Sequence, residues 1–357
     1  MNIVVTGAAG AVGTYVVQIL ASRGHKVTAI DLPERKIVEH PNVKRMYMDL
    51  TNKTVEDFKP IVRSMDGVIH TAAIVDIGKT REEMWPLNVV TTRRLATAAS
   101  EEMFCKFVHI SSGSIYSPSK SPITESHSLD DSSAYETSKI HSEAAIHVVG
   151  ENAADDFSWT ILRPALIYGP RARFLGATLA ALPSIAKTLG VRTLVGFRGG
   201  PTTNWVHAED VARAAVHVME YQDETTNRTF NIADDVPTPF GDTLSDYLEA
   251  SGQRLLYRVP LPGMSSIRLA KGLIDRDTTF DSINKVLKFG WDLTRRYHRV
   301  QDQLSVKLDR EASPYIFHNT IFDNSALKQT RFELKWPDHK NAIPYVLAWY
   351  QKNHWIP

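Results

Sequence analysis

Short runs of β-branched and other apolar residues alternate with longer stretches of helical periodicity over the first 165 residues. This rhythm is typical of a parallel sheet covered by helices on both faces, because each buried strand is followed by a helix that crosses back. Strands are predicted at residues 2–6, 26–30, 43–48, 67–70, 106–111 and 159–163. Helices are predicted at residues 11–23, 55–65, 82–102 and 133–149. The pattern therefore predicts an α/β fold with a doubly wound parallel sheet.

The alternation ends after Pro164, where prolines punctuate shorter elements. We therefore divide the chain into residues 1–165, which form the sheet, and residues 166–357, a smaller mixed α/β region. One strand of the second region, residues 229–232, is expected to return to the sheet. Residues 314–322 and 334–355 are apolar enough to pack on the body, and a cap over a cleft would suit the part of the chain after residue 255.

Residues 285–310 combine Lys and Arg with apolar positions. That combination suits a membrane surface, an acidic partner or the solvated face of an amphipathic helix. We favour the solvated face, because amphipathic helices on globular proteins are the common case.

The chain has 357 residues with 41 Lys and Arg against 40 Asp and Glu, so its formal net charge is +1. This balance argues against a basic nucleic-acid surface, and 43% apolar content predicts a globular protein. The single cysteine, Cys105, excludes an internal disulfide. None of the 13 histidines shows a ligand spacing, so no metal site is predicted. No apolar run reaches the ~18 residues of a membrane span, and we expect a soluble cytoplasmic protein.

Glycines recur between the first predicted strand and helix, in residues 6–13 with the sequence TGAAGAVG. Gly7 permits a tight turn, Gly10 lets backbone amides approach a pyrophosphate, and Gly13 lets the helix pack close to the sheet. The spacing alone also suits an ordinary turn from strand to helix. In this context it predicts a dinucleotide-binding turn.

Asp31 lies at the end of the second predicted strand. A carboxylate there can accept hydrogen bonds from an adenosine ribose diol and would repel a 2′-phosphate, so NAD is favoured over NADP. Arg35 and Lys36 follow closely and could neutralise a phosphate, which keeps NADP open. A solvent-exposed turn carboxylate is the other interpretation of Asp31.

Tyr135 and Lys139 are four residues apart on a predicted helix, so both side chains project from one face. An ammonium beside a phenol favours the phenolate and lowers a pKa that is ordinarily ~10 towards the range of a general base. Ser112, after a predicted strand, could hydrogen-bond the same substrate oxygen. Two surface residues are the usual origin of this spacing, but the upstream glycine turn and acid favour an active site.

These features together resemble the extended short-chain dehydrogenase/reductase family, of the NAD-dependent epimerase/dehydratase type, which implies a Rossmann-type fold. The matching positions run in the family's order over residues 2–235. They are residues 6–13, Asp31, Asp49, Leu50, residues 70–73, Asn88, Ser111, Ser112, residues 135–139, Arg163, Pro164 and residues 168–170, 205–207, 210–212 and 230–232.

The resemblance implies a role for each matching residue. Tyr135 would be the catalytic acid/base, Lys139 would bind the nicotinamide ribose and tune Tyr135, and Ser112 would position the reacting oxygen. Ser114 is a second candidate for that hydroxyl. Asp49 would bond the adenine amino group while Leu50 packs on the ring. Cofactor contacts are expected from Thr6, Gly7, Gly10, Ala11, Val12, Gly13, Asp31, Asp49, Leu50, Ala72, Ala73, Asn88, Tyr135, Lys139 and Pro164. Substrate contacts are expected from Val75, Gly113, Leu166 and Trp205, where Trp205 is either a core residue or a pocket wall.

Two departures from the family's sugar-acting members bear on the substrate. Dehydratases carry Asp-Glu where this chain has Gly113 and Ser114, so dehydration is disfavoured unless a carboxylate such as Glu125 reaches the site. Epimerases carry Arg-Asp where this chain has Thr203 and Asn204, which removes a cation for a diphosphate. Arg198, Arg171 and Arg173 are candidate replacements outside the matching place.

The loop after Ala73, residues 74–77, resembles the 3β-hydroxysteroid dehydrogenase branch more than the sugar branch. Ile74, Val75, Ile77, Leu166, Phe174, Leu175, Leu179 and Leu182 could wall an apolar pocket, and core packing is the other interpretation. The prediction is an NAD-dependent oxidoreductase that interconverts a secondary alcohol and a ketone on a steroid- or polyketide-like substrate. A nucleotide-sugar 4-epimerase with tightly bound NAD and a non-catalytic NAD sensor are the alternatives. A homodimer is expected from the resemblance.

Overall fold

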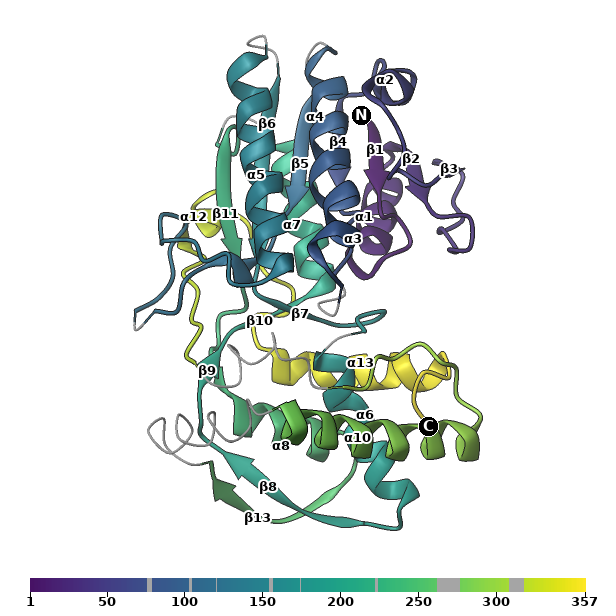
Figure 1. Cartoon of the computed structure of the whole chain (residues 1–357), viewed down its shortest axis with the longest axis vertical. Coiled ribbons are helices and arrows are strands. Elements are labelled where there is room, and N and C mark those ends of the chain that lie inside the picture. The colour runs from purple at the N-terminus through teal and green to yellow at the C-terminus, as the bar shows by residue number, and fades with distance from the viewer. Residues whose placement is uncertain are drawn as a thin grey trace.

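A seven-stranded parallel sheet forms the upper part of the molecule in the computed structural model (Figure 1). The structure describes residues 1–75, 79–102, 105–119, 121–153, 157–173, 175–221, 224–261, 277–307 and 318–357, with the backbone alone for 277–281. The strands lie in the order β11 (Arg228–Ile232), β6 (Ser158–Pro164), β5 (Lys106–Ile110), β4 (Gly67–His70), β1 (Asn2–Thr6), β2 (Lys26–Asp31) and β3 (Val43–Tyr47). The order reverses direction between β1 and β4, and a Rossmann-type sheet binds its ligand at that point.

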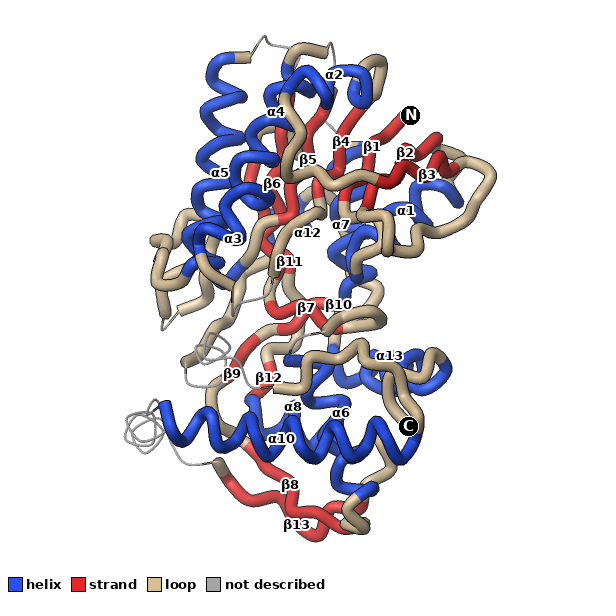
Figure 2. The backbone as a smooth tube through the Cα atoms, turned by 45° about the vertical axis from the view of Figure 1, so that its right-hand side comes forward, coloured by secondary structure: helices blue, strands red, loops and turns tan. Residues whose placement is uncertain are grey.

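Helices cover both faces of this sheet, as the sequence predicts (Figure 2). On one face α1 (Ala11–Ser22) packs against α7 (Ala208–Glu220), and their apolar side chains share a core with the strands. On the other face lie α2 (Val55–Val62), α4 (Thr92–Ser100) and α5 (Ala134–Asn152), which share a second core with the strands. The central strand β4 is buried at all four of its residues, which explains its continuous apolar sequence.

The single helix predicted at residues 82–102 is three consecutive helical segments in the structure. They are α3 (Arg81–Trp85), the π-helical segment η1 (Pro86–Thr91) and α4. Pro86 has no amide hydrogen to donate to the preceding turn, which favours a local change of helical hydrogen bonding. Sequence periodicity found the helical stretch and missed this change.

The second region lies below the sheet and has its own apolar core. Its helices are α6 (Leu175–Thr188), α8 (Phe240–Ala250), α10 (Asp277–His298), α12 (Ser325–Gln329) and α13 (His339–Lys352). Its strands pair as β7 (Leu166–Tyr168) with β10 (Trp205–His207), β8 (Thr193–Arg198) with β13 (Arg254–Pro260), and β9 (Thr202–Thr203) with β12 (Thr238–Pro239). The strand expected at residues 229–232 belongs to β11 and pairs with β6 in the main sheet.

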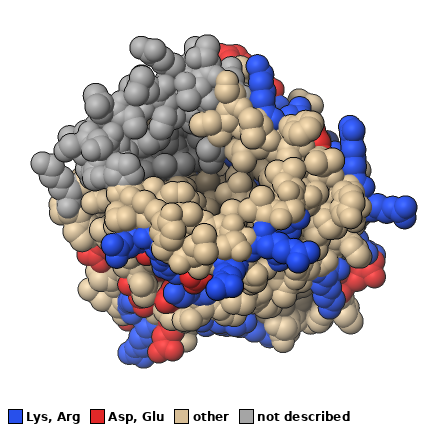
Figure 3. All heavy atoms as spheres, turned by 90° about the horizontal axis from the view of Figure 1, so that it is seen from below, with Lys and Arg blue, Asp and Glu red and all other residues tan. Residues whose placement is uncertain are grey.

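Residues 285–298 of the amphipathic stretch expected at 285–310 belong to α10, and residues 308–310 lie outside the described residues. Gly290 and Trp291 of α10 are buried and face the second core, whereas Val286 and Phe289 are 71% and 70% exposed. On the end of the molecule that this region forms, basic and acidic side chains are interspersed (Figure 3). No helix among the described residues combines the length and apolar character needed to cross a membrane.

After residue 318 the chain returns to the sheet. Phe322, Leu327 and Phe332 are buried in the same core as α1 and α7. Phe322 also forms a parallel bridge with Ile123, and Thr320 forms one with Thr203. Residues 314–317 of the predicted apolar segment lie outside the described residues. The helix α13, within the second predicted segment, packs on α8 and β10.

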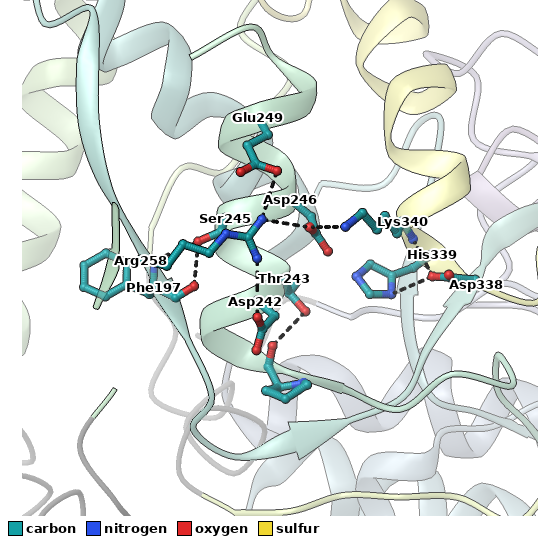
Figure 4. Close-up of polar contacts among 11 residues, drawn as sticks. Phe197, Asp242, Thr243, Ser245, Asp246, Glu249, Arg258, Asp338, His339 and Lys340 are labelled. Carbon is teal, nitrogen blue, oxygen red and sulfur yellow. Dashed lines mark hydrogen bonds and ion pairs between the residues drawn. The ribbon is translucent and has the colours of Figure 1, made fainter. Parts of the chain in front are cut away.

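An arginine joins strand β13 to helix α8 in the second region (Figure 4). The Arg258 guanidinium donates to Glu249 at 2.9 Å and lies 3.5 Å from Asp242 and 3.7 Å from Asp246. The Lys340 ammonium of α13 approaches Asp246 at 3.1 Å. Asp246 is 6% exposed, so these two cations compensate a buried carboxylate.

Arg258→Met is expected to lower the free energy of unfolding by roughly 1 kcal/mol, because it leaves Asp246 with Lys340 alone. Urea denaturation of the purified protein measures this loss. Arg254→Met is the matched control, since Arg254 is an exposed residue of the same strand. Equal losses for the two variants would contradict the ion-pair account.

Candidate active site

The glycine turn between β1 and α1 is as tight as its sequence predicts. Gly7 has a φ of +67°, and a Cβ at this residue would lie 2.7 Å from the Ala72 amide nitrogen. A Cβ on Gly13 would overlap the Gly7 carbonyl oxygen. Both positions therefore require glycine, Gly7 for its backbone conformation and both for the close approach of α1 and the loop after β4.

The start of α1 is built to receive an anion. Gly10 caps the helix without a side-chain hydrogen bond, and the first turn contains no acid. The amides of Ala11 and Val12 belong to the first helical turn, where no intrahelical acceptor exists. Backbone amides at the positive end of a helix dipole suit a pyrophosphate. The turn fits a dinucleotide on these grounds.

Asp31 ends β2 and is held against the glycine turn. One carboxylate oxygen accepts a hydrogen bond from the Ala9 amide at 2.8 Å, and the other accepts from the Leu32 amide at 2.8 Å. A carboxylate has further lone pairs, so Asp31 can still accept from a ribose diol. Arg35, considered from the sequence as a partner for a phosphate, is exposed four residues after Asp31.

Thr6 is held inside the sheet by hydrogen bonds. Its hydroxyl lies 2.7 Å from His70 Nδ1, and His70 Nε2 lies 2.9 Å from the Thr92 hydroxyl. Burial lowers the pKa of His70 to about 3, so the ring is neutral at physiological pH. The Thr6 side chain thus joins β1 to β4, and its backbone leads directly into the glycine turn at Gly7.

The residues expected around the adenine differ in exposure. Asp49 is exposed, and its carboxylate accepts a hydrogen bond from the Thr51 amide at 2.9 Å, which lowers its pKa. Leu50 is 5% exposed and packs in the core beneath α2 and α4. Ala72 and Ala73, after β4, are half-buried.

Asn88 links the loop after β4 to the helix α5. Its amide oxygen accepts from the Ile74 amide at 2.8 Å, and its amide nitrogen donates to the Ile74 carbonyl at 2.9 Å and to the Ser138 hydroxyl at 3.0 Å. The π-helical segment η1 carries Asn88. Asn88 therefore supports the expected cofactor path and the helix that carries Tyr135 and Lys139.

The structure brings Ser112, Tyr135 and Lys139 together. Ser133 caps α5, which places Tyr135 and Lys139 on its first turns. Ser112 precedes the short 3-10 helix η2 (Gly113–Ile115), which packs on α5, and its hydroxyl lies near the Tyr135 phenol. The Lys139 ammonium donates to the Ile110 carbonyl at 2.8 Å. Tyr135 is 8% exposed and Lys139 3% exposed, so neither is an ordinary surface residue.

The sequence-based expectation of a lowered Tyr135 pKa is wrong for this structure. Burial raises the pKa of Tyr135 above its ordinary value, and the Ser112 hydrogen bond opposes that shift. Burial also lowers the pKa of Lys139 to about 8, against the opposing effect of Glu143. The spacing of two residues on a helix does not report desolvation, which is the larger effect here.

Ser114 and Glu136 are two further polar residues beside this site, and the sequence alone assigned neither of them a role in proton transfer. The Ser114 hydroxyl lies 2.9 Å from that of Ser112 and near the Glu136 carboxyl. Glu125, the carboxylate considered from sequence, instead accepts from the Asn231 amide at 2.8 Å. The sequence does show that Glu136 directly follows Tyr135, but adjacency alone does not show which way the Glu136 side chain points.

The residues expected to contact substrate are mostly packed against protein. Trp205 is 1% exposed and makes a perpendicular ring contact with Tyr168 at 6.1 Å, which places it in the core and disfavours substrate contact. A Cβ on Gly113 would meet the Phe322 ring at 2.6 Å, and Pro164 ends β6 beside the same glycine. Val75 and Leu166 are half-buried.

Of the other apolar residues, Leu175 and Leu179 are buried in the second core, whereas Ile74 and Leu182 are half-buried. Core packing is therefore the better interpretation of Leu175 and Leu179. Ile77 and Phe174 lie outside the described residues. No cluster of three metal-ligating side chains occurs in the part of the chain that the structure describes.

The positions that replace the epimerase Arg-Asp pair are structural. Asn204 is 1% exposed, donates to the Asp234 carbonyl at 2.9 Å and accepts from the Phe322 amide at 2.9 Å. Arg171 and Arg173, considered as replacements, lie over the rings of Trp349 and Trp355. Arg198 is exposed at the end of β8.

The fold and the site together define an NAD-dependent enzyme of the extended short-chain dehydrogenase/reductase class. Residues 3–233 match the NAD dependent epimerase/dehydratase family, and the chain belongs to that family.

Its relatives include both steroid and sugar enzymes. A 3-beta-hydroxysteroid dehydrogenase from Mycolicibacterium neoaurum is 29% identical over 179 residues, which are 47% of this chain and 48% of the relative. The chain thus spans about half the length of that relative. A UDP-glucose 4-epimerase from Mycolicibacterium smegmatis is 30% identical over 234 residues, 60% of this chain and 72% of the relative. The crystal structure of UDP-glucuronic acid 4-epimerase from Bacillus cereus in complex with UDP-glucuronic acid and NAD has a TM-score of 0.69 at 20% identity, covering 99% of each chain.

Proposed function

We propose that this protein is an oxidoreductase that interconverts a secondary alcohol and a ketone on a largely apolar, steroid- or polyketide-like substrate. The observation that carries the proposal is the buried pair Tyr135 and Lys139, one helical turn apart at the start of α5, which packs on the short helix η2 that follows Ser112. The substrate class is supported by Thr203, which stands in the place of the diphosphate-binding arginine, is buried and donates its hydroxyl to the Thr320 carbonyl at 3.2 Å. A relative named 3-beta-hydroxysteroid dehydrogenase points the same way.

Bound NAD supplies the hydride acceptor for alcohol oxidation and the hydride donor in the reverse direction. The glycine turn and the first amides of α1 would hold its pyrophosphate, and Asp31 its adenosine ribose. Ser112 would hydrogen-bond the substrate oxygen and hold it beside the Tyr135 hydroxyl. Tyr135 would take the hydroxyl proton of the alcohol as the carbon-bound hydrogen leaves. Lys139, fixed on the Ile110 carbonyl, would hold its positive charge near the nicotinamide ribose.

A substrate panel tests this proposal against its nearest alternative. Reduced-cofactor absorbance should rise with NAD and a hydrophobic secondary alcohol such as a 3β-hydroxysteroid, and stay unchanged with UDP-glucose. A nucleotide-sugar 4-epimerase would retain NAD through purification and be stabilised against heat by UDP-sugars and not by steroids. That second pattern would overturn the oxidoreductase proposal. Tight NAD binding without turnover on either panel would instead indicate an NAD sensor.

We also propose that the enzyme works as a homodimer in the cytoplasm. The exposed side chain of Val148 on α5, 52% exposed, gives this helix an apolar surface residue that a helix-paired dimer could cover. The buried, unpaired Cys105 suits a reducing compartment. Sedimentation of the purified enzyme at several concentrations tests the dimer.

A further inference from the structure

An apolar stripe runs along the outer side of helix α10. Figure 2 shows α10 crossing in front of α6, against which it packs. Four apolar side chains of α10 are exposed, and they share one face of the helix because they are spaced three or four residues apart. They are Val286, Phe289, Leu293 and Tyr297. A solvated helix face would carry polar side chains at these positions.

The end of α6 adds a second pair of exposed apolar side chains. The Thr188 hydroxyl, in the last residue of α6, lies 3.2 Å from Nε2 of His298, the last residue of α10. Leu189 and Val191 follow Thr188, and both are exposed. They therefore lie next to the C-terminal end of the stripe. The six residues together are called the apolar patch below: Val286, Phe289, Leu293, Tyr297, Leu189 and Val191.

Exposed cations lie beside the apolar patch without acids to neutralise them. The two acids of residues 282–307, Asp292 and Asp302, both pair with Arg295, at 3.6 Å and 2.8 Å. Residues 183–192 contain no acid. The two segments therefore present an excess of positive charge. The exposed cations are Lys285, Lys288, Arg296 and Arg299 in and just after α10, with Lys187 and Arg192 at the end of α6.

We propose that the apolar patch and its cations bind this protein peripherally to the surface of a membrane that contains anionic lipids. The apolar side chains would enter the boundary between headgroups and acyl chains, and the cations would lie against the anionic headgroups. Tyr297 suits that boundary because it combines an apolar ring with a polar hydroxyl. The helix α10 would lie in the plane of the membrane surface.

Charge argues against a second copy of this chain as the occupant of the patch. In a two-fold dimer the same surface of both subunits meets, so the patch would face itself. The cations of the two copies would then lie opposite one another and repel. The cytoplasmic leaflet of a membrane instead supplies negative charge and an apolar interior together. An apolar substrate would also dissolve in that membrane, and this last point alone rests on the proposed function.

Vesicle flotation of the purified protein tests the proposal. We expect the protein to float with vesicles of phosphatidylcholine and phosphatidylserine, and not with vesicles of phosphatidylcholine alone. Binding should weaken as the salt concentration rises, because salt screens the attraction between cations and headgroups. Lys285→Gln combined with Lys288→Gln should weaken binding about 25-fold, at about fivefold for each cation. Lys26→Gln combined with Lys44→Gln is the matched control, because these lysines are exposed on β2 and β3.

The apolar contribution is tested separately. Phe289→Ser should weaken vesicle binding about 10-fold or more, since it removes an aromatic ring from the headgroup boundary. Val236→Ser is the matched control, because Val236 is an exposed apolar residue outside the patch. All of these side chains are exposed, so each variant should keep the circular dichroism spectrum of wild type.

A fluorescent label locates the contact on the molecule. Cys105 is buried, so Phe289→Cys provides an accessible thiol for an environment-sensitive dye. The emission of the labelled protein should shift to the blue when phosphatidylserine-containing vesicles are added. A dye attached through Lys44→Cys, at an exposed position of β3, should show no shift.

Three results would overturn the proposal. One is equal binding to both kinds of vesicle. Another is binding to neither, which is the result expected if an acidic protein or a second copy covers the patch. The third is wild-type vesicle binding in both the lysine double variant and Phe289→Ser. Because flotation requires no turnover, a protein that floats but oxidises no alcohol would contradict the proposed function and support this inference.

Discussion

Tyr135→Phe is expected to reduce alcohol oxidation by about 10³-fold, because general acid–base groups contribute ~10² to 10⁴. Phenylalanine keeps the ring, which is 8% exposed, and removes only the hydroxyl that would take the substrate proton. The measurement is steady-state kcat from reduced-cofactor absorbance with the best alcohol of the panel.

NAD affinity and circular dichroism serve as controls for the Tyr135→Phe variant, and both should match wild type. The phenol hydroxyl contributes to chemistry rather than to the glycine turn, so calorimetric titration with NAD should give a dissociation constant within a few-fold of wild type. Turnover at the wild-type rate would show that another group handles the proton.

Gly13→Ala is expected to weaken NAD binding about 100-fold, equivalent to about 2.7 kcal/mol. A Cβ at this position overlaps the Gly7 carbonyl oxygen, and the Thr71 hydroxyl lies 2.9 Å away, so the first turn of α1 must move from the loop. That movement misplaces the amides expected to bind the pyrophosphate. Calorimetric titration with NAD measures the effect.

Gly24→Asn is the matched control at the other end of the same helix. Gly24 has a φ of +85° with open space around its Cβ position, and asparagine tolerates this conformation. Its NAD affinity should equal that of wild type. Gly10→Ala should lie between the two variants, since its Cβ would be 3.1 Å from the Gly7 carbonyl oxygen. Unchanged NAD binding in Gly13→Ala would contradict the assignment of this turn.

Local patterns predicted the sheet well because parallel strands buried on both faces need continuous apolar runs. Every predicted strand up to residue 163 is present within a residue or two of its expected bounds. The glycines of the turn could likewise be predicted, since the turn geometry demands glycine at fixed offsets from the strand. Asp31 could be predicted because it ends the second strand. A local change of helical hydrogen bonding was harder to predict, as the π-helical segment that begins at Pro86 demonstrates.

Residues beyond the sheet were the least predictable. Trp205 was left open between core and pocket wall, and its burial against Tyr168 depends on β7 and β10, which are distant in sequence. The return of Phe322 to the sheet, where it packs on Gly113, is a contact across more than half the chain. Apolar character predicts that such residues are buried but not against which surface.

The sequence by itself determined the class of fold and the glycine turn, and it predicted Tyr135 and Lys139 on one helix and Ser112 after a strand, because each of these depends on spacing along one or two elements. The tertiary structure alone decided the electrostatics of these three residues. Burial raises the pKa of Tyr135, and the packing of η2 on α5 brings the Ser112 hydroxyl near the Tyr135 phenol. Desolvation and side-chain direction arise when separate elements pack together, and no local pattern encodes them.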